Sequence, residues 1–78
     1  MDINKKEILD IFLKYTGKDL KEKEDYKFFG KELDMQPREL LEVYLSIEQK
    51  YNIKFDKQKI LEGEFDTLKN VFQMLINL

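Results

Sequence analysis

A long amphipathic helix that starts at Pro37 constrains the fold of this chain more than any other feature. Proline suits the first position of a helix, because the N–H group that it lacks would have no partner inside the helix. At about 100° per residue, the apolar residues that follow fall on one stripe, which comprises Leu40, Val43, Tyr44, Ile47 and Tyr51. Polar residues fall on the opposite face. The sequence therefore predicts a helix over 37–51 that buries one side and leaves the other to water or to a partner.

Two leucines, Leu41 and Leu45, lie one turn apart on the flank of this stripe, beside Arg38 and Glu42. A flank between a core face and a polar face is the first place to look for a functional surface. Of the two leucines, Leu41 is interpreted as a core-lining residue. Glu42 and Glu48 fit a solvated helix face as well as they fit a contact with a partner.

A first helix is predicted over residues 2–15. Asn4 and Glu7 have the spacing of a capping box, and Gly17 can end the helix in a left-handed conformation. The apolar stripe consists of Ile8, Ile11, Phe12 and Tyr15, widened by Leu9 and Leu13. We interpret all of these apolar residues as core.

The segment 18–35 is the longest irregular part of the chain, and its first half is a run of charges of both signs. A connection of this length in so small a domain must be pinned to the core. The predicted anchors are Leu20, Phe28, Phe29 and Leu33. Gly30 allows a turn, and a single helical turn is predicted over 26–31.

Local signals end the long helix and place a short one after it. Asn52 can cap the long helix in a left-handed conformation. Asp56 can then cap a short helix over Lys57–Leu61 that ends near Gly63.

A final helix is predicted over Leu68–Ile76, with Asp66 or Thr67 as its N-cap. Its expected buried residues are Leu68, Val71, Phe72, Leu75 and Ile76. No segment shows the alternation or the turn signals of a strand or hairpin. The predicted fold class is all-α, with three main helices plus one short helix in a single domain over residues 1–78.

The composition excludes several classes of function. With no Cys and no His, the chain can form no disulfide, no zinc or iron–sulfur site and no histidine-based catalytic site. The carboxylate pairs Glu22/Glu24 and Glu62/Glu64 lie in charged segments where nothing prepares them for acid–base catalysis. We therefore expect no enzyme, no catalytic residue and no metal.

Charge and hydropathy exclude two further kinds of partner. The net charge is −2 and both signs are interspersed, so the basic stripe that nucleic-acid binding requires is missing. No apolar run approaches the roughly 18–20 residues needed to cross a bilayer, and the N-terminus lacks a signal-peptide core. We expect a cytoplasmic monomer that contacts neither nucleic acid nor a membrane.

The order of these elements, together with four short motifs, resembles the acyl carrier protein family. The motifs are Phe29-Gly30-Lys31-Glu32-Leu33, Glu42-Val43, Ile47-Glu48-Gln49-Lys50-Tyr51 and Phe65-Asp66-Thr67-Leu68. The resemblance covers nearly the whole chain. It implies an acyl carrier protein-like bundle in which the helix that starts at Pro37 is the second helix.

One departure from that family concerns its chemistry. Carriers attach a phosphopantetheine arm to the serine of an Asp-Ser-Leu motif at the start of the second helix. Here Gln36-Pro37-Arg38 stands at that place, and Pro37 has no hydroxyl or thiol group. Ser46, the one serine of the chain, lies far into the helix, where no carrier bears its arm. The resemblance thus implies a carrier-like fold without an attachment site or a cofactor.

The resemblance also implies a surface for partner enzymes, made by acidic and hydrophobic residues of the second helix. The corresponding positions here are Arg38, Glu39, Glu42, Leu45 and Glu48, with Arg38 in place of a hydrophobic residue. The leading hypothesis is a non-catalytic binding module that docks on a biosynthetic or peptide-maturation enzyme, similar to carrier-related proteins of bacterial peptide maturation systems. The alternative is a working acyl or peptidyl carrier that is modified elsewhere or holds its cargo noncovalently between the helices.

Overall fold

Four helices make up the regular structure of this chain. The computed structural model describes residues 3–63 and 65–77, and its helices are α1 (Lys5–Thr16), α2 (Pro37–Tyr51), α3 (Lys57–Leu61) and α4 (Leu68–Ile76). Within the described residues there is no strand, apart from one isolated antiparallel bridge between Lys27 and Thr67. The predicted all-α class and the predicted bounds of α2, α3 and α4 are confirmed.

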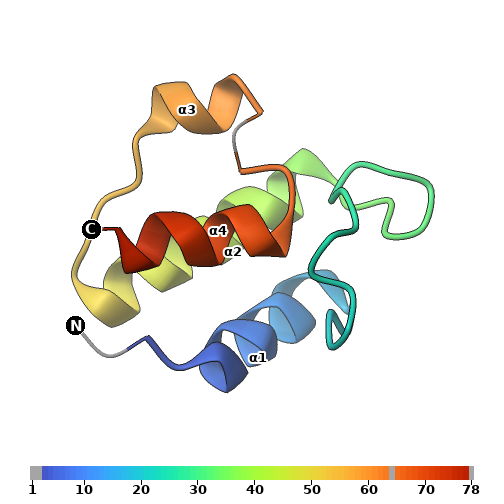
Figure 1. The fold of residues 1–78 in the computed structure, drawn as a ribbon, viewed down its shortest axis with the longest axis horizontal. Coiled ribbons are helices and arrows are strands. Elements are labelled where there is room, and N and C mark those ends of the chain that lie inside the picture. The colour runs from blue at the N-terminus through green and yellow to red at the C-terminus, as the bar shows by residue number, and fades with distance from the viewer. Residues whose placement is uncertain (1–2, 64, 78) are drawn as a thin grey trace.

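The helices α1, α2 and α4 enclose the core, whereas α3 stands to one side of them and the 18–36 connection loops out beside the end of α1 and the start of α2 (Figure 1). None of the helices in the described part of the chain is both long enough and apolar enough to cross a membrane.

Side-chain and backbone caps set the ends of α1. The Oδ1 atom of Asn4 accepts hydrogen bonds from the backbone N–H groups of Lys6 (2.9 Å) and Glu7 (3.3 Å). Gly17 ends the helix at φ +72°, as predicted. Because Asn4 is the N-cap, the helix starts at Lys5 rather than at residue 2, which lies outside the described residues. Only half of the predicted capping box forms, because the N–H of Asn4 donates to the hydroxyl of Tyr51 (3.3 Å) and not to the Glu7 carboxylate. The Tyr51 hydroxyl in turn donates to Glu7 (3.2 Å).

The other helix ends follow the predicted signals. Asn52 has a left-handed conformation (φ +53°) and its N–H bonds the carbonyl of Glu48 at the end of α2. The side chain of Asp56 accepts from the N–H of Gln58 at the start of α3. Of the two candidates at the start of α4, Thr67 is the N-cap, because its hydroxyl accepts from the N–H of Asn70.

The connection before α2 contains no helix, so the helical turn predicted over 26–31 is wrong. Its backbone pairs instead with the start of α4: the N–H of Phe28 donates to the carbonyl of Asp66 (2.7 Å), and the N–H of Lys69 donates to Glu24 (3.0 Å). The N–H of Met35 donates back to Phe28 (2.8 Å). These bonds hold the connection against α4 and position the N-terminus of α2.

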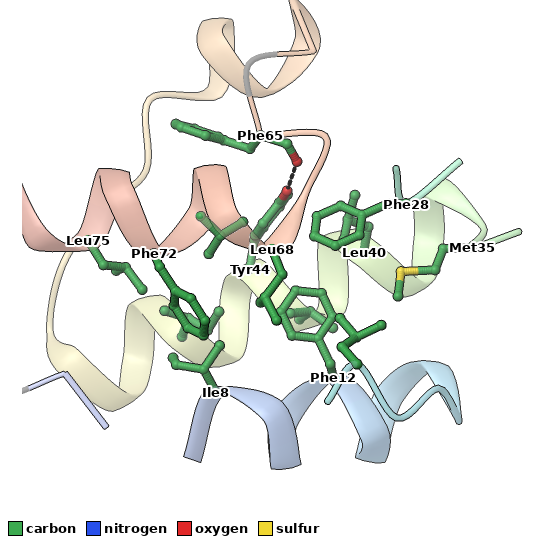
Figure 2. Close-up of a cluster of buried hydrophobic side chains, with 14 of the residues drawn as sticks. Ile8, Phe12, Phe28, Met35, Leu40, Tyr44, Phe65, Leu68, Phe72 and Leu75 are labelled. Atoms are coloured by element: carbon green, nitrogen blue, oxygen red, sulfur yellow. Dashed lines mark hydrogen bonds between the residues drawn. The ribbon is translucent and has the colours of Figure 1, made fainter. Parts of the chain in front are cut away.

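The core gathers side chains from α1, α2, α4 and the connection around one centre (Figure 2). Phe12 of α1 lies against Phe28, with ring centroids 5.2 Å apart. The buried hydrophobic residues are Ile8, Phe12, Leu20, Phe28, Leu33, Met35, Leu40, Val43, Tyr44, Ile47, Phe55, Phe65, Leu68, Val71, Phe72 and Leu75. Four residues predicted to lie in or beside the core are exposed instead, namely Leu13, Phe29, Leu41 and Ile76. Phe28 and Phe29 lie in a turn closed by the bond from the N–H of Gly30 to the carbonyl of Lys27, and only Phe28 is directed into the core.

Candidate functional site

Two large hydrophobic residues of α2, Leu41 and Leu45, are exposed to solvent. Leu41 is 56% exposed and Leu45 is 45% exposed, whereas the other aliphatic residues of α2 are buried. The interpretation of Leu41 as a core-lining residue is therefore wrong. Leu45 follows Leu41 by four residues, so the two side chains lie on neighbouring turns of the same helix face.

Charged residues border this pair. Arg38 and Glu42 are both exposed, and neither makes a salt bridge within the described part of the chain. Arg38, Leu41, Glu42 and Leu45 together form one continuous exposed area, which we call the α2 surface. It combines two apolar side chains with one charge of each sign.

The two other predicted partner residues on α2, Glu39 and Glu48, are half-buried and already bonded to the backbone. The Oε1 atom of Glu39 accepts from the N–H of Gln36 (2.9 Å), which stabilises the first turn of α2. The Oε2 atom of Glu48 accepts from the N–H of Phe55 (2.7 Å), which holds the chain that leaves α2. The structure thus places Arg38, Glu42 and Leu45 on one surface. Glu39 and Glu48 stabilise the backbone at the two ends of α2.

At the start of α2, Pro37 is the first helical residue and is exposed to solvent. The sequence resemblance to acyl carrier proteins would align this position with their serine. Its pyrrolidine ring carries no atom that could attack coenzyme A. The residues present therefore do not fit a phosphopantetheine arm.

The serine and threonine hydroxyl groups elsewhere do not replace the missing nucleophile. Thr16 is buried and donates to the carbonyl of Phe12 (2.6 Å). Thr67 accepts from the N–H of Asn70 as the N-cap of α4. Ser46 is half-buried and borders a shallow groove between α1 and α2. None of the three is exposed at a helix start.

An open groove of about 660 Å³ lies between α3 and α4, away from the α2 surface. Six of its eight lining residues are polar or charged, with Lys54, Asp56, Lys59, Asn70, Gln73 and Asn77 beside Phe65 and Met74. An acyl chain needs a mainly apolar cavity, so this groove does not favour the alternative of noncovalently held cargo. Among the described residues, no group of three or more acidic side chains could hold a metal ion.

Comparisons with known proteins identify no relative of this chain. No family model, no curated protein and no solved structure matches the chain. The all-α fold and the α2 surface therefore come from the structure, and the likeness to acyl carrier proteins comes from the motifs of the sequence.

Proposed function

We propose that this protein is a non-catalytic, acyl carrier-like binding module that docks on a biosynthetic or peptide-maturation enzyme through the α2 surface. The observation that carries this proposal is the exposed pair Leu41 and Leu45 on a helix whose first residue, Pro37, lacks a nucleophile. The helix keeps the shape of a docking element although its first residue offers no hydroxyl or thiol group to which a cargo could be attached.

Two structural features support a docking role for α2. Its first turn is stabilised by the bond from Gln36 to Glu39, and its last turn by the left-handed cap at Asn52. Because both ends of α2 are capped, the backbone beneath the α2 surface is already ordered. Little backbone conformational entropy is therefore lost when a partner binds. Exposed leucines beside charged residues are typical of a contact with an apolar centre and a polar rim.

The test restores the missing nucleophile. The Pro37→Ser variant and the wild type are each incubated with coenzyme A and a broad-specificity phosphopantetheinyl transferase, and their intact masses are measured. We expect the serine variant to gain the arm and the wild type to stay unmodified. Modification of neither protein would contradict the carrier-like surface, and modification of the wild type would contradict the loss of the attachment site.

A second pair of variants tests the α2 surface itself. In the Pro37→Ser background, Leu45→Glu places a charge at the centre of the surface, and we expect the rate of modification to fall by about tenfold or more, equivalent to about 1.4 kcal/mol. Leu13→Glu is the matched control, because Leu13 is 48% exposed and lies on α1. An equal effect of both substitutions would contradict a specific role for α2.

A further inference from the structure

The exposed side of α2 has a second property, which concerns the order of its residues. Arg38, Leu41, Leu45 and Glu48 follow one another at spacings of three, four and three residues, so they form one straight stripe along the helix. We call these four residues the α2 stripe. A spacing of this kind is the one by which two helices pack side by side.

The α2 stripe is self-complementary when two helices run antiparallel. If Leu41 of one copy faces Leu45 of the other, a two-fold axis passes midway between the two leucines. The same register then places Arg38 of each copy opposite Glu48 of the other. A parallel arrangement would instead bring Arg38 against Arg38 and Glu48 against Glu48, which repel one another.

We propose that a second copy of this chain docks on the α2 stripe, as an antiparallel, two-fold symmetric dimer held by the four leucines and by two Arg38–Glu48 pairs. The proposal goes beyond the proposed function and does not depend on it, because it requires only the α2 stripe. Its consequence for that function is competition: a partner enzyme that docks on Leu41 and Leu45 has to displace the second copy.

The groups required for these pairs are available. Arg38 is exposed and makes no salt bridge within residues 3–63 and 65–77. Glu48 uses its Oε2 atom to accept from Phe55, and its Oε1 atom has no described hydrogen bond, so the carboxylate can accept from an arginine and still hold the backbone. The arginine would contact a carboxylate whose position is already fixed.

One residue opposes the association. Glu42 lies beside the stripe and close to the two-fold axis, so the two Glu42 side chains of a dimer approach each other at its rim. The contact also falls short of the roughly 1,200 Å² that stable complexes bury, since each copy contributes two leucines and two charged residues. The dimer is therefore weak, and the protein is a monomer in dilute solution.

The test is a charge exchange followed by sedimentation equilibrium from about 10 μM to about 1 mM, the range suited to a weak interface. We expect the wild type to approach twice the monomer mass at the upper end. Arg38→Glu alone and Glu48→Arg alone should remain monomers, because each homodimer then holds only like-charged pairs. An equimolar mixture of these two variants should dimerise again, because the heterodimer contains two opposite-charge pairs.

Glu42→Gln is the complementary variant and should lower the dissociation constant several-fold by removing the repulsion at the axis. Circular dichroism would reveal whether Glu48→Arg fails to fold. In that case Glu42→Gln and Arg38→Glu still test the dimer, because the first should lower its dissociation constant and the second should raise it. A wild type that remains monomeric at about 1 mM would overturn the proposal. A dimer that the mixed variants do not restore would overturn the antiparallel register.

Discussion

The hydroxyl of Tyr44 links α2 to the segment that precedes α4, because it donates a hydrogen bond of 2.8 Å to the carbonyl of Phe65 (Figure 2). Its ring lies within a cluster with Phe55 and Phe65, at centroid distances of 5.2 and 6.4 Å. Burial raises the pKa of Tyr44 well above its usual range, and the nearby charge of Asp66 raises it further. The sequence predicted that Tyr44 is buried, but not which atom its hydroxyl would reach.

Replacing Tyr44 by Phe should lower the free energy of unfolding by about 1 kcal/mol at neutral pH, because the hydrogen bond to Phe65 is lost while the ring stays packed. Above about pH 10 the unfolded wild type loses the Tyr44 proton, whereas the folded protein retains it. Because the pKa of Tyr44 is raised in the folded protein, the contribution of its hydroxyl to the free energy of unfolding is complete below about pH 10 and declines as the pH rises. Urea titrations of both proteins should show their difference shrinking with alkaline pH. A difference that grows would contradict the assignment.

The exposed hydrophobic residues mark the limit of what the sequence predicts at this scale. Helical periodicity placed Leu41 on the flank of the apolar stripe, but whether a flank is covered depends on the neighbouring elements and not on α2 alone. Leu13 and Ile76 are exposed for the same reason, since each lies at the margin of its own helical stripe. The sequence placed Leu41 and Leu45 one turn apart on this flank, and both are exposed, although Leu41 was interpreted as core-lining.

At the scale of single elements, the sequence predicted far more. The ends of α2, α3 and α4 depend on local chemistry, such as a proline at the first position, an aspartate or threonine that caps a start, or an asparagine that accepts a left-handed conformation. These signals act within one helical turn and are readable without tertiary structure. The irregular connection has no such signals, and there the predicted helical turn was wrong.

The end of α2 provides a direct test of one of these signals. Asn52 lies at φ +53°, where a Cβ atom is strained unless the side chain is Asn or absent as in Gly. Asn52→Ala should therefore lower the free energy of unfolding by about 1 kcal/mol. Asn52→Gly is the matched control and should change it by less than about 0.5 kcal/mol, since relief of strain offsets the greater entropy of the unfolded chain. Thermal unfolding of both variants measures the contrast, which equal losses of stability would contradict.

At the scale of the whole molecule, the connection between α1 and α2 depends on its pairing with α4. Phe28 and Asp66, and likewise Glu24 and Lys69, are far apart in the sequence and are brought together by the tertiary fold. No local pattern encodes that meeting, which is why the position of this connection could not be predicted. We call this contact between the connection and the start of α4 the seam. Its two salt bridges, Lys27–Asp66 and Lys69–Asp25, each involve a largely exposed lysine and contribute little. The backbone bonds and the buried Phe28 therefore hold the connection in place.

Hydrogen exchange can show whether this seam opens with the bundle or separately from it. The N–H of Phe28 is bonded to Asp66 across the seam and belongs to a fully buried residue, so its exchange requires the connection to leave α4. Because that step would expose Phe28 and uncover Phe12, we expect the free energy of exchange at Phe28 to equal that of global unfolding. The N–H of Lys23 is the internal control: it bonds Leu20 within a local turn of an exposed segment and should exchange with a free energy several kcal/mol lower. The free energies are obtained by NMR in deuterated buffer, with each exchange rate referred to the intrinsic rate of that amide. A value at Phe28 as low as that at Lys23 and well below that of global unfolding would mean that the connection detaches while α1, α2 and α4 remain packed. It would contradict the role of the connection in holding the N-terminus of α2.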